Sequence, residues 1–171
     1  MVIDVSSILK ETGGSIKISG DIKAQDTDYL GEEFHFEKPF NISGELINNG
    51  KSIVLKAEVL GEMGVCCARC RKPITINLQF LIEETFMQGN EDFKPDEDIY
   101  VFSGYTIDLD DVVFNNFLMN VSGKYLCKED CKGLCTHCGA DLNDGDCGCE
   151  DDNIDPRWEA LRAMIKDTET E

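Results

Sequence analysis

The sequence predicts an α+β fold in which an antiparallel β-sheet or partial barrel, from about residue 15 to residue 86, packs on one helix. Two observations predict this. Apolar and polar residues alternate through 41–47, 52–60 and 74–82, which is the period of strands with one buried face. Apolar residues then recur at helical spacing behind Asp108. A cysteine-rich segment and a short terminal helix complete the expected architecture.

The strand predictions rest on separate local patterns. The sequence N-N-G at 48–50 lies between the first two alternating runs and indicates a hairpin. A third strand should begin near Met63, after Gly61. The fourth, over 74–82, places five apolar residues on one face: Ile74, Ile76, Leu78, Phe80 and Ile82. Cys67 and Cys70 should therefore lie at the turn between the third and fourth strands.

The helix is expected from Asp108, as the N-cap, to Val121, with Gly123 as its stop. The polar, acidic stretch 88–98 is typical of a surface loop. Near the end of the chain, D-P at 155–156 should begin a short helix. Its apolar stripe consists of Trp158, Leu161, Met164 and Ile165.

The length of 171 residues suits one moderate domain that carries a small metal-bound appendage. We expect a β-rich domain with its packing helix over 1–126. The cysteine-rich zinc segment and the C-terminal helix should occupy 127–171. The first residues do not resemble a secretion signal, and no apolar run approaches the roughly 20 residues that cross a bilayer. We therefore expect a cytoplasmic protein with no membrane partner.

The chain has 34 acidic residues against 16 Lys and Arg, a formal net charge of -18. Such a surface repels phosphate backbones. A role with nucleic acid would therefore need a local basic patch or an intermediary protein. A basic protein, in contrast, would be attracted over long range.

Nine cysteines in a reducing compartment point to metal or catalysis before disulfides. Cys135 and Cys138, followed by a glycine, resemble a zinc knuckle, and Cys147 and Cys149 supply a second short pair. Zinc takes four ligands in a tetrahedron, so these four cysteines form a complete local site.

The remaining cysteines permit more than one assignment. Cys67, Cys70, Cys127 and Cys131 can form a second four-cysteine site. Alternatively, Cys67 and Cys70 combine with Cys135 and Cys138 in a single site. One or two zinc ions per chain are thus both compatible with the spacing. Cys66 is expected to be a small core residue.

The sequence contains no pattern that indicates catalysis. A redox C-x-x-C would need a helix N-terminus in a βαβ context, which neither motif shows. Only His35 and His137 are available for a hydrolytic zinc site. We expect His35 in a strand and His137 in solvent, and we predict a protein that binds without catalysis.

Bases gather beside the cysteines, although bases are scarce in this chain. They are Arg69, Arg71, Lys72, Lys124, Lys128 and Lys132. We favour the interpretation that they offset the negative charge of zinc tetrathiolates. The alternative is a small patch for RNA or an acidic partner.

These motifs resemble those of the YceD family, the large ribosomal RNA subunit accumulation proteins of bacteria and plastids. The resemblance is carried by C-A-R-C at 67–70, L-C-K-E-D-C-K-G-L-C-T-H-C-G-A-D-L-N at 126–143, C-G-C at 147–149 and D-P-R-W-E-A-L-R at 155–162. Thr136 stands where proline is common in the family. Some members keep the first cysteine pair and lack the C-terminal cluster.

The resemblance implies a role in the synthesis, processing or accumulation of large-subunit ribosomal RNA. The first hypothesis is a zinc-stabilised accessory factor in ribosome assembly that acts through a ribosomal protein or an rRNA-processing factor. The second is a zinc module that binds ribosomal RNA directly, and a metal-dependent enzyme ranks last. The sequence leaves the oligomeric state open.

Overall fold

The computed structural model describes residues 1–29, 31–89 and 99–149, and this part is mainly β-sheet with one helix. The expectation of an α+β fold is therefore confirmed in part. In chain order the elements are β1 (Val2–Asp4), β2 (Ser15–Ile22), β3 (Thr27–Tyr29), β4 (Glu32–Phe34), β5 (Phe40–Asn48), β6 (Ile53–Cys66), β7 (Pro73–Gln88), β8 (Ile99–Phe102), β9 (Thr106–Asp108) and α1 (Asp110–Asn120).

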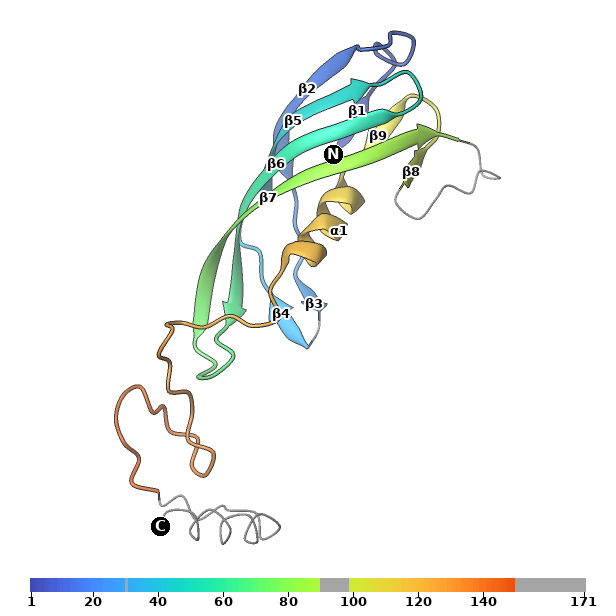
Figure 1. Ribbon diagram of the computed structural model, residues 1–171. Coiled ribbons are helices and arrows are strands. Elements are labelled where there is room, and N and C mark those ends of the chain that lie inside the picture. Colours follow the sequence, from blue (N-terminus) through green and yellow to red (C-terminus); the bar gives the residue numbers. More distant parts are fainter. Residues whose placement is uncertain (30, 90–98, 150–171) are drawn as a thin grey trace, which may run out of the picture.

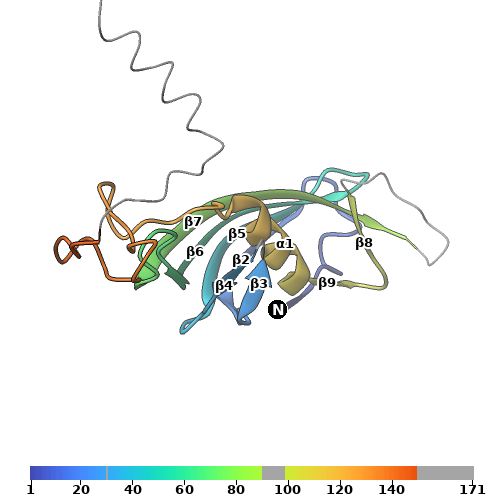
Figure 2. The same cartoon turned by 90° about the horizontal axis from the view of Figure 1, so that it is seen from below.

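The main sheet has the strand order β2-β5-β6-β7-β8. Its first four strands are antiparallel neighbours, as expected for 15–86, and β8 adds a parallel edge beside β7. Two small antiparallel pairs, β1 with β9 and β3 with β4, lie outside this sheet. Figure 1 shows that α1 crosses one face of the main sheet, and Figure 2 shows that the sheet curves over it.

The prediction of a separate third strand near Met63 is wrong, because β6 runs unbroken from Ile53 to Cys66. Gly61 lies inside that strand. A Cβ at this position would collide with the ring of Phe40, so the glycine makes room for a buried side chain and does not end the strand. The hairpin at 48–50 is confirmed, since β5 pairs with β6 from Asn48 and Ile53 outward.

The helix begins later than expected, at Asp110, and its N-cap is Leu109. Asp108 is instead the last residue of β9, where it pairs with Val2. Its carboxylate still accepts a hydrogen bond from the Asp110 amide, at 3.1 Å. The helix ends at Asn120, before the expected stop at Gly123, because Val121 is already extended.

Aromatic rings fill the core between the sheet and α1. Phe117 is fully buried, with its ring centroid 5.2 Å from that of Phe36, 5.6 Å from that of Phe40 and 5.9 Å from that of Phe34. The expected core face of β7 is confirmed: Phe80 and Ile82 are buried, and Ile74, Ile76 and Leu78 are half-buried against the core.

Replacing Phe80 with Ala should destabilise the protein by about 3–5 kcal/mol, since the ring is 5% exposed and its removal leaves a cavity. Urea unfolding followed by circular dichroism measures this. Leu81→Ala is the matched control: Leu81 follows directly on the opposite face, is 76% exposed, and should change the free energy of unfolding by less than about 0.5 kcal/mol. Equal effects of both would show that the register of β7 is wrong.

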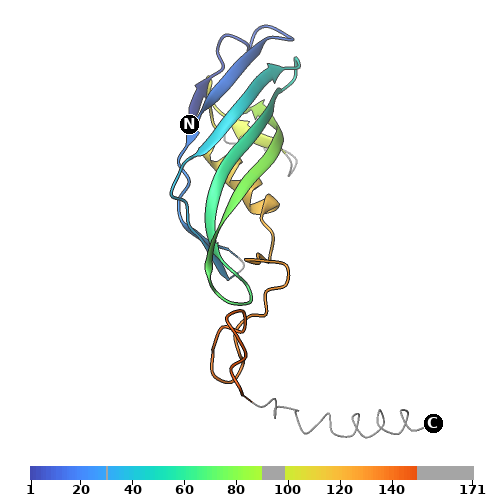
Figure 3. The ribbon, with the colours of Figure 1, turned by 90° about the vertical axis from the view of Figure 1, so that its left-hand side faces the viewer.

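The tip of the β6–β7 hairpin carries the turn 67–72 toward the cysteine-rich segment (Figure 3). Beside it, His35 follows β4 and forms an isolated bridge with Gly64 of β6, so it lies next to a strand and not within one. The expected C-terminal helix with Trp158 and most of the expected loop 88–98 lie outside the described residues.

Candidate metal centre

Eight of the nine cysteines form two groups of four. The proximal cluster consists of Cys67, Cys70, Cys127 and Cys131, and the distal cluster of Cys135, Cys138, Cys147 and Cys149. Within each group, all four sulfur atoms lie within 4.8 Å of one another. Either group could hold a metal ion. The alternative of Cys67 and Cys70 combined with Cys135 and Cys138 is not the arrangement that the fold produces.

The proximal cluster joins parts of the chain about sixty residues apart. The Sγ atoms of Cys67 and Cys131 are 3.8 Å apart, and those of Cys70 and Cys127 are 3.6 Å apart. Cys67, Cys70 and Cys131 are buried, and Cys127 is exposed. The group is therefore largely closed to solvent, as in sites whose role is structural.

A tight turn at the tip of the β6–β7 hairpin positions the first two sulfurs. The Cys67 amide donates to the carbonyl of Lys72 at 2.8 Å, and the Arg71 amide donates to the carbonyl of Cys67 at 2.9 Å. Arg71 has a φ of 57°, a left-handed conformation that closes the turn. The Ala68 amide then donates to the carbonyl of Tyr125 at 2.8 Å, which brings the second half of the cluster alongside.

The distal cluster is built from a local knuckle. The Cys135 amide donates to the carbonyl of Ala140 at 2.7 Å, and the Gly139 amide donates back to the carbonyl of Cys135 at 2.9 Å. Gly139, at φ 73°, permits this reversal. The His137 amide points at the Cys135 sulfur, at 3.4 Å. The residue itself is exposed, as expected, and its ring is not among the grouped ligand atoms.

The crowding of thiols separates their pKa values. Burial opposes the ionisation of Cys67, but the backbone amides of Cys70, Cys127 and Arg69 outweigh it and lower the pKa of Cys67 to about 6. Desolvation of its sulfur, followed by the thiols of Cys70 and Cys131, raises the pKa of Cys127 to about 12. Four adjacent thiolates repel one another, so all four can ionise near neutral pH only around a cation.

The distal cluster shows the same division. Backbone amides of Cys138 and His137 lower the pKa of Cys135 to about 6. The neighbouring thiols of Cys138 and Cys147 raise the pKa of Cys149 to about 12. Both groups therefore have the donor set and the electrostatics of a site for a thiophilic cation.

Two polar residues that the sequence analysis did not single out tie the clusters together. Asn143, in the distal loop, points its side-chain amide at the Cys131 sulfur, at 3.4 Å, and accepts a hydrogen bond from the Lys132 amide at 3.0 Å. Asp141 is bound by Lys72, with 2.8 Å between Oδ2 and Nζ. The Lys72 ammonium compensates the charge of Asp141 Oδ2, a buried oxygen that has no hydrogen bond of good geometry. Together with the Asn143 amide, this ammonium lowers the pKa of Asp141 to about 2. The only signal in the sequence that could have identified Asp141 and Asn143 is their place in A-D-L-N, directly after the knuckle.

Half of the nearby bases are held in internal contacts. The Arg69 guanidinium donates to the carbonyl of Cys131 at 2.6 Å, Arg71 lies 3.4 Å from Glu32, and Lys72 binds Asp141. The partners in these three contacts are a carbonyl and two carboxylates, so the charge compensation of zinc tetrathiolates by these bases stays a prediction. Cys66 belongs to neither group, and it is half-buried where a core residue was expected.

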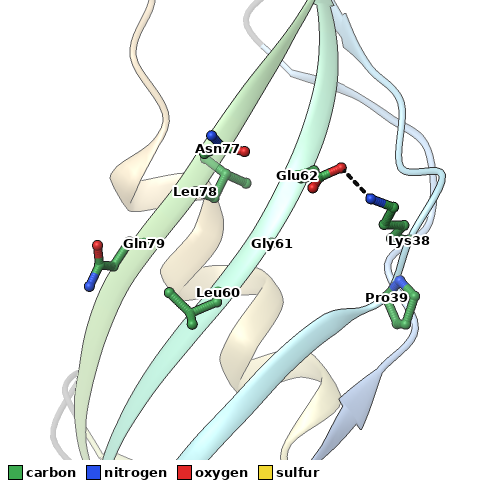
Figure 4. Close-up of a pocket in the computed structure, with 8 residues that line it drawn as sticks. All are labelled: Lys38, Pro39, Leu60, Gly61, Glu62, Asn77, Leu78 and Gln79. Carbon is green, nitrogen blue, oxygen red and sulfur yellow. Dashed lines mark hydrogen bonds and ion pairs between the residues drawn. The ribbon is translucent and has the colours of Figure 1, made fainter.

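Other polar sites in the described residues are weaker candidates. His35 Nδ1 lies 3.0 Å from Asp26 Oδ2, which raises the pKa of the histidine, but both side chains are more than half exposed. A hollow over β6 and β7 is lined by the ion pair of Lys38 with Glu62 and by apolar and amide side chains (Figure 4). These side chains are Pro39, Leu60, Leu78, Asn77 and Gln79. Neither brings together a nucleophile and a base.

Among the described residues, the one helix is too short and too polar to span a membrane.

A family model described as "Large ribosomal RNA subunit accumulation protein YceD" matches residues 55–164. An uncharacterized protein of Mycobacterium tuberculosis is 28% identical over 102 residues, which cover 58% of this chain and 49% of that protein. Uncharacterized protein YlbN of Bacillus subtilis is 21% identical over 156 residues, 89% of each chain. The chain thus spans about half the length of the mycobacterial relative. No solved structure matches it.

Proposed function

The chain belongs to the YceD family of large ribosomal RNA subunit accumulation proteins, and we propose that it is a zinc-binding accessory factor in the accumulation or processing of that RNA and in ribosome assembly. It acts in the cytoplasm by binding, without catalysis. The observation that carries the proposal is the gathering of eight cysteines into two sets of four within the matched region. The mycobacterial and Bacillus relatives are themselves uncharacterized, so they add no activity.

The spacing of the sulfurs supports zinc as the cation. A zinc tetrathiolate has Zn–S bonds of about 2.3 Å, and a tetrahedron of that size has S···S edges of about 3.8 Å. Two edges of the proximal cluster measure 3.8 and 3.6 Å. A set of four thiolates leaves no open coordination position, which suits a structural ion and not a hydrolytic one.

Replacing Asn143 with Ala should lower the zinc affinity of the proximal cluster about 10–100-fold, because the amide no longer supports the Cys131 sulfur. Competition with a chromophoric chelator measures this affinity. Asn77→Ala is the matched control, since Asn77 is exposed on β7 and, unlike Asn143, makes no side-chain hydrogen bond to a cysteine in the described part of the chain. An unchanged affinity in Asn143→Ala would show that the contact with sulfur has no energetic role.

A basic ribosomal protein is the partner that the charge favours. The net charge of -18 opposes an RNA backbone, and three of the six bases beside the clusters are engaged internally. Direct binding of ribosomal RNA is the second candidate function, because Lys124, Lys128 and Lys132 form no ion pair among the described residues.

A pull-down of the zinc-loaded full chain from growing cells tests the proposal, with and without ribonuclease. We expect ribosomal proteins or an rRNA-processing factor to remain bound after the RNA is digested. If instead the chain binds ribosomal RNA fragments with an affinity that falls steeply with salt, and Lys124, Lys128 and Lys132 are needed for it, the direct RNA hypothesis replaces this one. Capture of neither class would contradict both.

A further inference from the structure

The first edge of the main sheet, β2, has an open side. β2 pairs over its full length, Ser15 to Ile22, with β5 on one side only. In an antiparallel strand, alternate residues direct their N–H and C=O groups away from the neighbour. Within the described residues, no backbone hydrogen bond reaches these outward groups of β2. The strand therefore presents a long, unpaired template for another strand.

Two of the usual protections of an edge, a proline and a β-bulge, are absent from β2. It contains no proline, and its register with β5 is continuous, without a bulge. Ile18 and Ile22 are buried on the core face, while Ile16 on the same face is only half-buried. An added strand would cover the exposed part of Ile16.

The outer face of β2 is self-complementary in charge. Lys17, Ser19 and Asp21 lie on it in this order and are exposed. If a second copy of β2 pairs antiparallel about Ser19, each Lys17 lies opposite Asp21 of the other copy. Opposite charges directly across two strands are favourable. Lys17 forms no ion pair among the described residues, and Asn41 occupies one oxygen of Asp21, at 3.0 Å.

The neighbouring registers are worse. Any alternative register must keep the outer side chains of both copies on the same face of the joined sheet. The nearest registers that do so are centred on Ile18 and on Gly20. A centre at Gly20 places Lys17 opposite Lys23 of the other copy, which is repulsive. A centre at Ile18 places both Lys17 and Asp21 opposite serines, Ser19 and Ser15. Charge therefore selects Ser19.

We propose that two copies of this chain associate through β2, in an antiparallel pair centred on Ser19 that joins the two main sheets edge to edge. The two-fold symmetry explains why one strand carries both charges of the pair. Figures 1 and 3 show β2 at the end of the sheet away from the cysteine-rich segment, so pairing leaves both clusters accessible. The interface is small and each copy is strongly acidic, so the dimer belongs to the weak class.

Sedimentation equilibrium of the zinc-loaded full chain, at up to about 200 μM to reach the weak regime, tests this. The wild type should approach twice the monomer mass. Lys17→Asp alone and Asp21→Lys alone should each raise the dissociation constant at least about tenfold, because like charges then face each other twice. Mixing these two variants should restore association, since every pair across the mixed dimer is again of opposite sign. The double variant should self-associate like the wild type.

Lys56→Asp is the control. It changes the net charge by the same amount on the same outer face, but in β6, where Lys56 pairs with Glu83 at 3.0 Å. It should leave the dissociation constant within about twofold of the wild type. Unfolding midpoints confirm that each variant is folded. A wild type that remains monomeric would overturn the proposal and leave the edge to a strand of another protein. Failure of the mixed variants to restore association would also overturn it.

Discussion

Chelation of zinc is expected to unfold the segment 127–149 while the main sheet stays folded. The segment has few apolar residues, chiefly Leu134, Ala140 and Leu142, and Leu134 is 37% exposed. Ordering each residue costs about 1–2 kcal/mol, which so little apolar surface cannot offset. A structural zinc site contributes about 10–16 kcal/mol of apparent binding free energy in small peptides, so the metal can supply the difference.

Hydrogen exchange with mass spectrometry, before and after the chelator, measures this result. Amides of 127–149 and of the turn at 67–72 should lose their protection. Amides of β5 and of β6 up to Val59 should keep theirs, because their apolar face packs on α1 and on the other strands. A segment that stays protected without metal would contradict the account, as would a sheet that unfolds together with it.

Removing two cysteines from one cluster at a time should cost one zinc ion in either case, but the two losses should differ in their effect on the structure. Cys67→Ser with Cys70→Ser should cost one zinc ion and also release the segment from the hairpin tip, because the proximal cluster joins two cysteines of the tip to two cysteines of the segment. The Ala68 amide, bonded to the Tyr125 carbonyl at 2.8 Å, should then exchange much faster.

Cys147→Ser with Cys149→Ser should also cost one zinc ion but leave the Ala68 amide protected, since the proximal cluster needs no distal ligand. Elemental analysis and hydrogen exchange on the same samples make the comparison. Loss of both ions in either double variant would show that the eight sulfurs load as one unit. That outcome would assign a larger role to Asn143 and to the pair of Lys72 with Asp141, which connect the two clusters.

The local parts of the fold could be predicted from the sequence, and the long-range pairings could not. Alternation identified the β5–β6 hairpin and the core face of β7, because one buried face fixes a period of two. It could not identify the pairing of β1 with β9, which joins residues about a hundred positions apart in the chain. It also could not identify the parallel strand β8, because its four residues, I-Y-V-F, are too few to show a period of two. Gly61 was misread as a break because its reason, the ring of Phe40, is distant in sequence.

The candidate site divides in the same way. Cysteine spacing gave the eight residues and the complete distal set, whose members lie within fifteen residues of one another. The grouping of Cys67 with Cys131 required the fold, because only the β6–β7 hairpin brings them together. Asp141 and Asn143 were missed, since a polar residue in a loop has no pattern that marks its partner as a sulfur or a lysine.

Native mass spectrometry of the purified full chain, grown without added metal, tests the central claim most directly. The account predicts two zinc ions per chain, with the eight clustered cysteines protected from alkylation and released together with the metal at acid pH, where thiolates are protonated. The wild-type spectrum should therefore differ from the metal-free chain by the mass of two zinc ions, less the displaced protons. Fewer than one zinc ion per chain, with all thiols freely reactive, would contradict it.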